Sequence, residues 1–115
     1  MFYKINIINN IETIDNLNNS IFNILWFSAE WCNPCKELNK ILNQITLNYQ
    51  IKNKELNIYK IDVDKLETEF IINKLPTLII LDNNLKEKYR KEGINNIKEF
   101  IEQLDELQFI QTDDF

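Results

Sequence analysis

Cys32 and Cys35 are the only two cysteines among the 115 residues, and they stand two residues apart in the segment AEWCNPCK. Such a pair has three interpretations: a redox-active dithiol, part of a metal site, or two inert core thiols. A structural zinc site normally takes four Cys or His ligands, and this chain has no histidine, so a metal would need carboxylates or a second subunit. The spacing favours a redox pair, and we expect no metal site.

The elements on either side of the pair indicate how it would react. An apolar run over 21–27, typical of a strand buried on both faces, precedes it, and a helical apolar stripe follows from Pro34 to about Tyr49. Cys32 would therefore stand at a helix amino terminus, which favours an anion and lowers a thiol pKa, in known cases to roughly 3.5–7.5. Cys35, one turn further, is close enough to attack a mixed disulfide at Cys32. We predict Cys32 as the nucleophile and Cys35 as the resolving thiol.

The remaining segments alternate between the periodicities of strands and helices. The predicted strands cover 2–8, 21–27, 56–63, 77–81 and 86–91, and the predicted helices cover 11–17, 34–49, 64–70 and 96–107. Asp64 with Glu67, and Asn96 with Glu99, have the spacing of helix caps. The order β-α-β-α-β-α-β-β-α predicts an α/β fold with a central mixed β-sheet and helices on both faces. We expect one domain over 1–115, with 108–115 as a loosely ordered tail.

Composition narrows the class of partner and the compartment. The net charge is −5 and the lysines and arginines are scattered, so we expect no nucleic-acid partner. The first residues, MFYKINIINNIET, have neither a continuous apolar region nor a small-residue cleavage site, and no stretch is long enough to span a membrane. We therefore expect a cytoplasmic protein, in a reducing compartment where paired cysteines are more often catalytic than structural.

The residues around the pair resemble the active site of the thioredoxin family, usually Trp-Cys-Gly-Pro-Cys-Lys. Here the segment reads Trp31-Cys32-Asn33-Pro34-Cys35-Lys36, and both the preceding Phe27-Ser28-Ala29-Glu30 and the distant Leu75-Pro76-Thr77 are similar to the family's. The element order agrees along the whole chain. The resemblance implies the thioredoxin fold and a protein-disulfide reductase, an electron carrier in cell redox homeostasis. Its partners would be protein disulfides and thioredoxin reductase. The resemblance also implies that the chain is a monomer, that it binds no cofactor, and that it receives its electrons from an NADPH-dependent flavin reductase.

The resemblance also implies roles for residues outside the cysteine pair. Pro76 would be cis and pack beside the pair, leaving the Leu75 backbone to bind an extended substrate segment, although a proline that merely begins a strand is the alternative. Gly93, the only glycine, would let a substrate backbone approach, or simply supply a turn with positive φ. The expected substrate-binding residues are Trp31, Leu75, Pro76, Thr77 and Gly93. The expected supporting residues are Glu30, Trp31, Asn33, Pro34, Lys36, Lys60 and Pro76, with a merely solvated Lys60 as the alternative.

Two departures from the family pattern bear on the chemistry. Trp26 stands where the family usually has a buried Asp that relays a proton for the resolving thiol. A tryptophan accepts no proton, so deprotonation of Cys35 should be slower, or Glu30, Lys60 or water should take over. Asn33 replaces the usual glycine, and the sequence does not give the direction of its effect on the redox potential. A disulfide isomerase or oxidase of the same fold, or a thioredoxin-like binding subunit with little turnover, remain the alternative functions.

Overall fold

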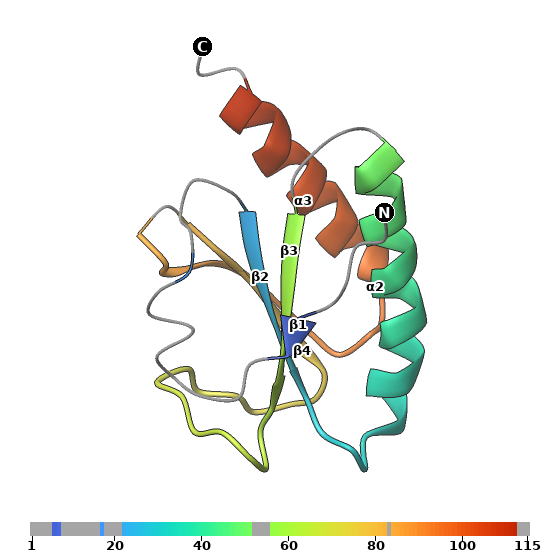
Figure 1. Cartoon of the computed structure of the whole chain (residues 1–115), viewed down its shortest axis with the longest axis vertical. Helices are drawn as coiled ribbons and strands as arrows, with labels where there is room; N and C mark the ends of the chain where they lie inside the picture. The colour runs from blue at the N-terminus through green and yellow to red at the C-terminus, as the bar shows by residue number, and fades with distance from the viewer. Residues whose placement is uncertain (1–5, 8–16, 18–21, 52–55, 83, 113–115) are drawn as a thin grey trace.

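The computed structural model describes residues 6–7, 17, 22–51, 56–82 and 84–112, which form a five-stranded sheet in the order β1-β3-β2-β4-β5 with two helices (Figure 1). The strands are β1 (Asn6–Ile7), β2 (Phe22–Ser28), β3 (Leu56–Asp62), β4 (Thr77–Leu81) and β5 (Glu87–Glu92), and the helices are α2 (Asn33–Ile51) and α3 (Ile97–Thr112). β3 pairs in parallel with β1 and β2, whereas β4 is antiparallel to β2 and β5. The predicted α/β fold with a mixed sheet is confirmed.

β2 lies at the centre of the sheet, and its sequence explains why. Residues 23–29 are all buried, and so is the whole of β4, because apolar side chains on both faces of these strands pack into two separate cores. β5 forms one edge and is rich in charged residues, of which Glu87, Lys88 and Glu92 are exposed, and such charges discourage pairing with another chain. The strands expected over 21–27, 56–63, 77–81 and 86–91 are therefore present, while most of the strand expected over 2–8 lies outside the described residues.

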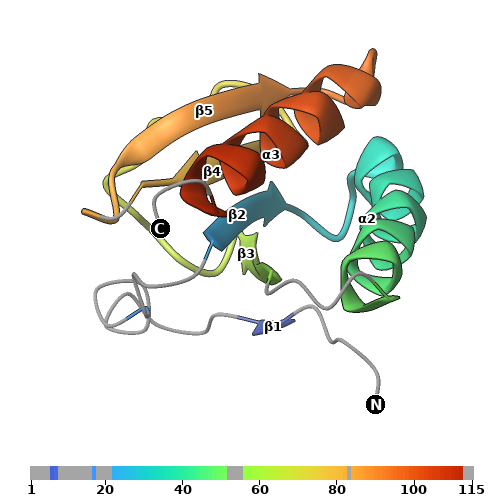
Figure 2. The ribbon, with the colours of Figure 1, turned by 90° about the horizontal axis from the view of Figure 1, so that it is seen from above.

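Both described helices pack on the same face of the sheet (Figure 2). Leu38, Leu42 and Ile45 of α2, with Phe100 and Leu104 of α3, share one core with alternate residues of β2, β3 and β4. This core also contains both cysteines, so the packing of α2 onto the sheet fixes where the pair lies. On the opposite face the partly buried residues include Leu66, Phe70 and Ile72 from the segment between β3 and β4. The helix expected over 11–17 lies outside the described residues except for Leu17.

The helix expected over 64–70 is not formed, and this prediction was wrong. The segment begins with a turn, in which the Asp62 carbonyl accepts hydrogen bonds from the N–H groups of Lys65 and Leu66. The Asp62 side chain accepts the Asp64 N–H, and the Thr68 hydroxyl accepts the Phe70 N–H. Asp and Thr side chains that bind nearby N–H groups compete with helical hydrogen bonds. The cap-like pattern here therefore stabilises a turn.

The last helix is longer than its apolar stripe indicated. α3 continues to Thr112, so 108–112 are helical where a loosely ordered tail was expected, and 113–115 lie outside the described residues. No glycine or proline follows Leu107 to end the helix, which accounts for the extension. Within the described part of the chain, neither helix is long and apolar enough to cross a membrane.

Candidate redox site

Cys32 and Cys35 are joined by a disulfide, with their Cα atoms 5.3 Å apart. This separation lies in the range of roughly 4.4–6.8 Å that a disulfide requires. The expected juxtaposition of the two thiols is therefore confirmed. Both residues are almost covered, with 3% of Cys32 and 2% of Cys35 exposed. In the described residues, no group of three or more Asp, Glu, Cys or His side chains could hold a metal ion.

The amino end of α2 positions Cys32. The chain leaves β2 at Ser28, and a turn in which the Cys32 N–H donates to the Ala29 carbonyl leads into the helix at Asn33. Pro34 suits the first turn because no intrahelical partner exists there for its missing N–H. The backbone N–H of Cys35 donates to Sγ of Cys32 at 3.2 Å. A thiolate at Cys32 would therefore be stabilised by a direct donor and by the helix dipole.

Two side-chain contacts tie the turn before the cysteines to the segment after β3. Trp31 is 67% exposed, and its Nε1 donates to Oδ2 of Asp64 at 2.8 Å. The Lys65 ammonium lies 3.1 Å from a carboxylate oxygen of Glu30. The hydrogen bond to Glu30 raises the pKa of Lys65 above its usual value, and the negative charges of Glu30 and Asp62 raise it further. Trp31 is therefore an exposed aromatic surface next to the disulfide whose orientation is fixed at its polar end.

Trp26 belongs to the core that contains both cysteines and is 1% exposed. It stands opposite Lys60 in the parallel pairing of β2 with β3, and the Lys60 ammonium lies 5.0 Å from the centroid of its ring, within the range of a cation–π contact. An open pocket of about 310 Å³ lies beside Cys35. Its lining includes Trp26, Ser28, Ala29, Glu30, Cys35, Lys36, Asn39 and Lys60.

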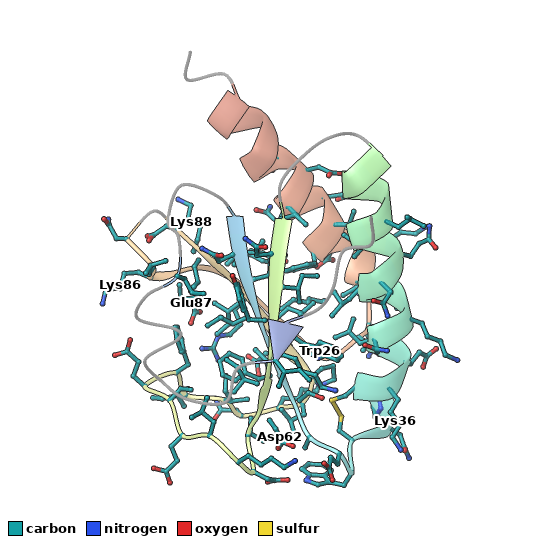
Figure 3. The ribbon with its side chains drawn as sticks, in the orientation of Figure 1. Trp26, Lys36, Asp62, Lys86, Glu87 and Lys88 are labelled. Carbon is teal, nitrogen blue, oxygen red and sulfur yellow. A yellow bond between two sulfur atoms is a disulfide. The ribbon has the colours of Figure 1, made fainter. Side chains whose placement is uncertain are left out.

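Figure 3 shows the disulfide near the amino end of α2, close to Lys36. Three of the expected supporting residues, Glu30, Lys36 and Lys60, line the pocket beside Cys35, and Lys60 also contacts the Trp26 ring. Asn33 and Pro34, in the first turn of α2, are exposed. Glu30 also lines the pocket, although 80% of its side chain is exposed to solvent.

The segment before β4 approaches the pair because β2 and β4 are antiparallel. Their register pairs Phe27 with Thr77, which places the start of β4 beside the end of β2. The Leu75–Pro76 peptide is cis, Pro76 is buried, and Leu75 packs against the core that contains both cysteines. Thr77 is fully buried, and its hydroxyl donates to the Lys74 carbonyl at 2.6 Å. Its side chain thus supports the bend and is enclosed, unlike the substrate contact that the sequence predicted.

Gly93 contacts this bend from the end of β5. Its N–H donates to the Pro76 carbonyl at 2.7 Å, and its φ is 78°, a conformation that L-residues rarely adopt. A Cβ atom at this position would lie 3.4 Å from Cε of Lys74, an ordinary contact. The conformation, more than the available space, therefore explains why glycine is kept here.

Three residues of the site were not predicted from the sequence. Asp64 and Lys65 were assigned to a helix start but contact Trp31 and Glu30, and nothing local to them signals those partners. Lys74 was not singled out, yet its side chain lies over Gly93. Its position directly before Leu75-Pro76-Thr77 was the only signal that could have drawn attention to it.

Comparison with known proteins agrees with this geometry. The family model described as thioredoxin matches residues 5–106. A thioredoxin-like protein of Synechocystis sp. is 32% identical over 81 residues, covering 68% of this chain and 73% of that protein. The thioredoxin of Rickettsia typhi is 32% identical over 79 residues, covering 69% of this chain and 74% of that protein. The crystal structure of thioredoxin from Trypanosoma brucei brucei has a TM-score of 0.75 at 22% identity, covering 94% of this chain and 95% of that one, which shows the shared fold.

Proposed function

Because this chain belongs to the thioredoxin family and its two cysteines form a disulfide, we propose that this thiol–disulfide oxidoreductase works as a protein-disulfide reductase. The observation that carries the proposal is the Cys32–Cys35 bridge at the amino end of α2, with Sγ of Cys32 accepting the Cys35 N–H at 3.2 Å. An attacking thiolate needs such stabilisation, and a resolving thiol needs such proximity.

In the proposed reaction, the Cys32 thiolate attacks one sulfur of a substrate disulfide. The substrate S–S bond breaks, its other sulfur leaves as a thiolate that takes up a proton, and a mixed disulfide joins Cys32 to the substrate. Cys35 then loses its proton and attacks Sγ of Cys32. The mixed disulfide breaks and releases the second substrate thiol. The substrate gains two electrons and two protons, while the cysteine pair is oxidised to the internal disulfide.

The neighbouring residues have distinct parts in this proposal. Trp31 offers the exposed apolar contact for a substrate, and the bend at Leu75 and Pro76 receives its extended backbone. Lys60 and Lys36 bring positive charge to the pocket beside Cys35, which favours the thiolate that must form there. Glu30, which lines the same pocket, or water would accept the proton.

The cycle closes when the internal disulfide is reduced again. We propose that the electrons come from an NADPH-dependent flavin reductase of the thioredoxin reductase type, that the chain itself holds no cofactor, and that it acts as a monomer in the cytoplasm. The absence of a glycine-rich phosphate loop from the sequence supports an external source of electrons.

An insulin-reduction assay tests the reductase directly. The protein should catalyse insulin precipitation by dithiothreitol, whereas Cys32→Ser should not exceed the uncatalysed rate. Cys35→Ser should accumulate a mixed disulfide visible by mass spectrometry. Catalysis that survives in Cys32→Ser would refute the assignment of the nucleophile, and no catalysis by the unmodified protein would favour a binding subunit with little turnover.

The equilibrium with glutathione separates a reductase from an isomerase or oxidase. A dithiol that is only weakly stable relative to its disulfide is expected of a reductase, whereas a very stable dithiol is expected of an oxidase. Redox titration followed by quenching and mass spectrometry gives this constant.

A further inference from the structure

The side chain of Lys74 covers the surface where a substrate backbone would approach Gly93. Its Cε and Nζ lie 3.4 Å and 3.6 Å from the position that a Cβ atom at Gly93 would take. The Gly93 N–H donates a hydrogen bond to the Pro76 carbonyl, and Leu75 packs against the core that contains the cysteines. A segment that docks on the Leu75–Pro76 bend beside Gly93 must therefore meet the Lys74 ammonium.

The Lys74 ammonium is available to an incoming group. The residue is exposed, and among the described residues no carboxylate lies within ion-pair distance of it. Carboxylates of β5 and of the first turn of α3 interact with other cations. The Glu87 hydrogen bond raises the pKa of Arg90, with a smaller contribution from the charge of Glu92, and Glu99 lies 3.9 Å from the Lys91 ammonium.

The carboxylates on the other side of the disulfide are also engaged. Glu30 pairs with Lys65, and Asp64 accepts the hydrogen bond from Trp31. Lys36, next to Cys35, adds a second exposed ammonium. Although the whole chain carries a net charge of −5, Lys36 and Lys74 are both exposed and neither forms an ion pair with another described residue.

We propose that Lys74 determines specificity, selecting substrates that carry an acidic side chain close to the cysteine that Cys32 attacks. This inference rests on the proposed function, because it names the class of disulfide that the same site prefers. An exposed ion pair contributes modestly, so the expected preference for an acidic over a neutral neighbour is roughly two- to fivefold in rate.

Substitutions at position 74 can test this selection without removing the backbone hydrogen bond that the residue forms. The Lys74 carbonyl accepts the Thr77 hydroxyl at 2.6 Å, and any residue at position 74 keeps that carbonyl. Lys74→Met retains the unbranched apolar chain over Gly93 without its charge, and Lys74→Glu reverses the charge. Lys86→Glu is the matched control, because Lys86 is exposed and Figure 3 shows it well away from the disulfide.

The probes are three peptides that differ only in having Glu, Gln or Lys two residues from a single cysteine, which is activated as a thionitrobenzoate disulfide. Stopped-flow absorbance measures the second-order rate of thionitrobenzoate release by reduced Cys35→Ser protein, with and without each substitution. The rates should fall in the order Glu, Gln, Lys. Lys74→Met should remove the order, Lys74→Glu should reverse it, Lys86→Glu should keep it, and added salt should weaken it.

If the Lys74→Met variant still reacts with the three peptides at rates in the same order, the proposal is overturned. It is also overturned if Lys86→Glu changes the peptide preference as much as Lys74→Glu does, because net charge alone would then explain the preference. Circular dichroism melting of each variant checks that it is folded. The peptide assay does not require turnover, so the two proposals fail separately. If insulin is not reduced but the peptide preference still depends on Lys74, only the proposed reductase function is rejected. If insulin is reduced but the peptide preference does not depend on Lys74, only the inference about Lys74 is rejected.

Discussion

The Lys60 ammonium lies 5.0 Å from the centroid of the Trp26 ring, and both side chains line the pocket beside Cys35. The contact follows from the sheet, since parallel pairing sets Trp26 opposite Lys60. The indole Nε1 is buried and has no hydrogen-bond partner among the described residues. Cys35 therefore faces an aromatic ring and a cation, and its proton must leave through the open side of the pocket.

Trp26→Asp should accelerate the resolving step near neutral pH. A carboxylate at position 26, in the lining of the pocket beside Cys35, would take the proton from Cys35, and a well-placed general base contributes roughly 10²–10⁴-fold. Because position 26 is 1% exposed, the same change should lower the free energy of unfolding by about 3–5 kcal/mol through lost packing and the burial of a carboxylate. Rapid-quench measurement of mixed-disulfide resolution and urea denaturation give the two quantities.

Trp26→Asn is the matched control, because it leaves a similar cavity without a base. The Asp variant should resolve the mixed disulfide faster than both the Asn variant and the unsubstituted protein. Equal rates for Asp and Asn, or no gain over tryptophan, would count against a shortage of base at Cys35.

Asp64→Ala should loosen Trp31, since it removes the acceptor of the 2.8 Å hydrogen bond from Nε1. We expect easier quenching of Trp31 fluorescence by acrylamide in a Trp26→Phe background. We also expect a fall in kcat/KM for protein disulfides of about two- to fivefold, equivalent to the roughly 0.5–1 kcal/mol that such a contact contributes. Asp64→Asn keeps an acceptor oxygen and should behave like the parent. If Ala and Asn have the same effect, the hydrogen bond is not what orients Trp31.

Gly93→Ala should destabilise the fold by about 1–2 kcal/mol, because an L-residue at φ 78° is strained. Steric conflict adds little, since the nearest atom to the new Cβ is the flexible end of Lys74 at 3.4 Å. Gly93→Asn should cost less, because Asn tolerates positive φ better than Ala does. Urea denaturation at neutral pH measures both, and a loss equal in the two variants would point to crowding as the cause.

Glu87→Gln should remove a pH-dependent contribution to stability. The hydrogen bonds from Arg90 lower the pKa of Glu87 from its usual 4.5, against a smaller opposing effect of burial. A lowered folded-state pKa stabilises the protein above the unfolded-state value, and this contribution is lost as the pH falls through the folded-state value. The variant should therefore be less stable at pH 7, by at most about 1 kcal/mol because the pair is partly exposed.

The difference between Glu87→Gln and the parent should shrink as the pH falls below 4.5 and vanish once Glu87 is protonated. Thermal unfolding over a pH series measures it. Glu102→Gln serves as control, because Glu102 is exposed on α3 and forms no ion pair with another described residue. A difference for Glu87→Gln that stays constant with pH would exclude the ion pair as its source.

Local patterns in the sequence were enough to predict the dithiol and most of its frame. The cysteine spacing, the apolar run of β2 and the helical stripe of α2 each involve residues within a few turns of one another. They therefore predicted the position of Cys32 at a helix start and the reach of Cys35, both of which the disulfide and the Cys35 N–H bond confirm. Gly93 could likewise be singled out, because positive φ is a property of one residue's own backbone.

Tertiary structure alone decided the contacts that distinguish this site. The cap-like Asp64 became the partner of Trp31, 33 positions earlier in the chain, and the helix predicted from it did not form. Lys60 was brought onto the Trp26 ring by strand register, and Lys74 was brought over Gly93 by the meeting of β4 with β5. No local period encodes these pairs, because their distances are set by how the sheet and helices pack, and packing depends on residues far apart in the sequence.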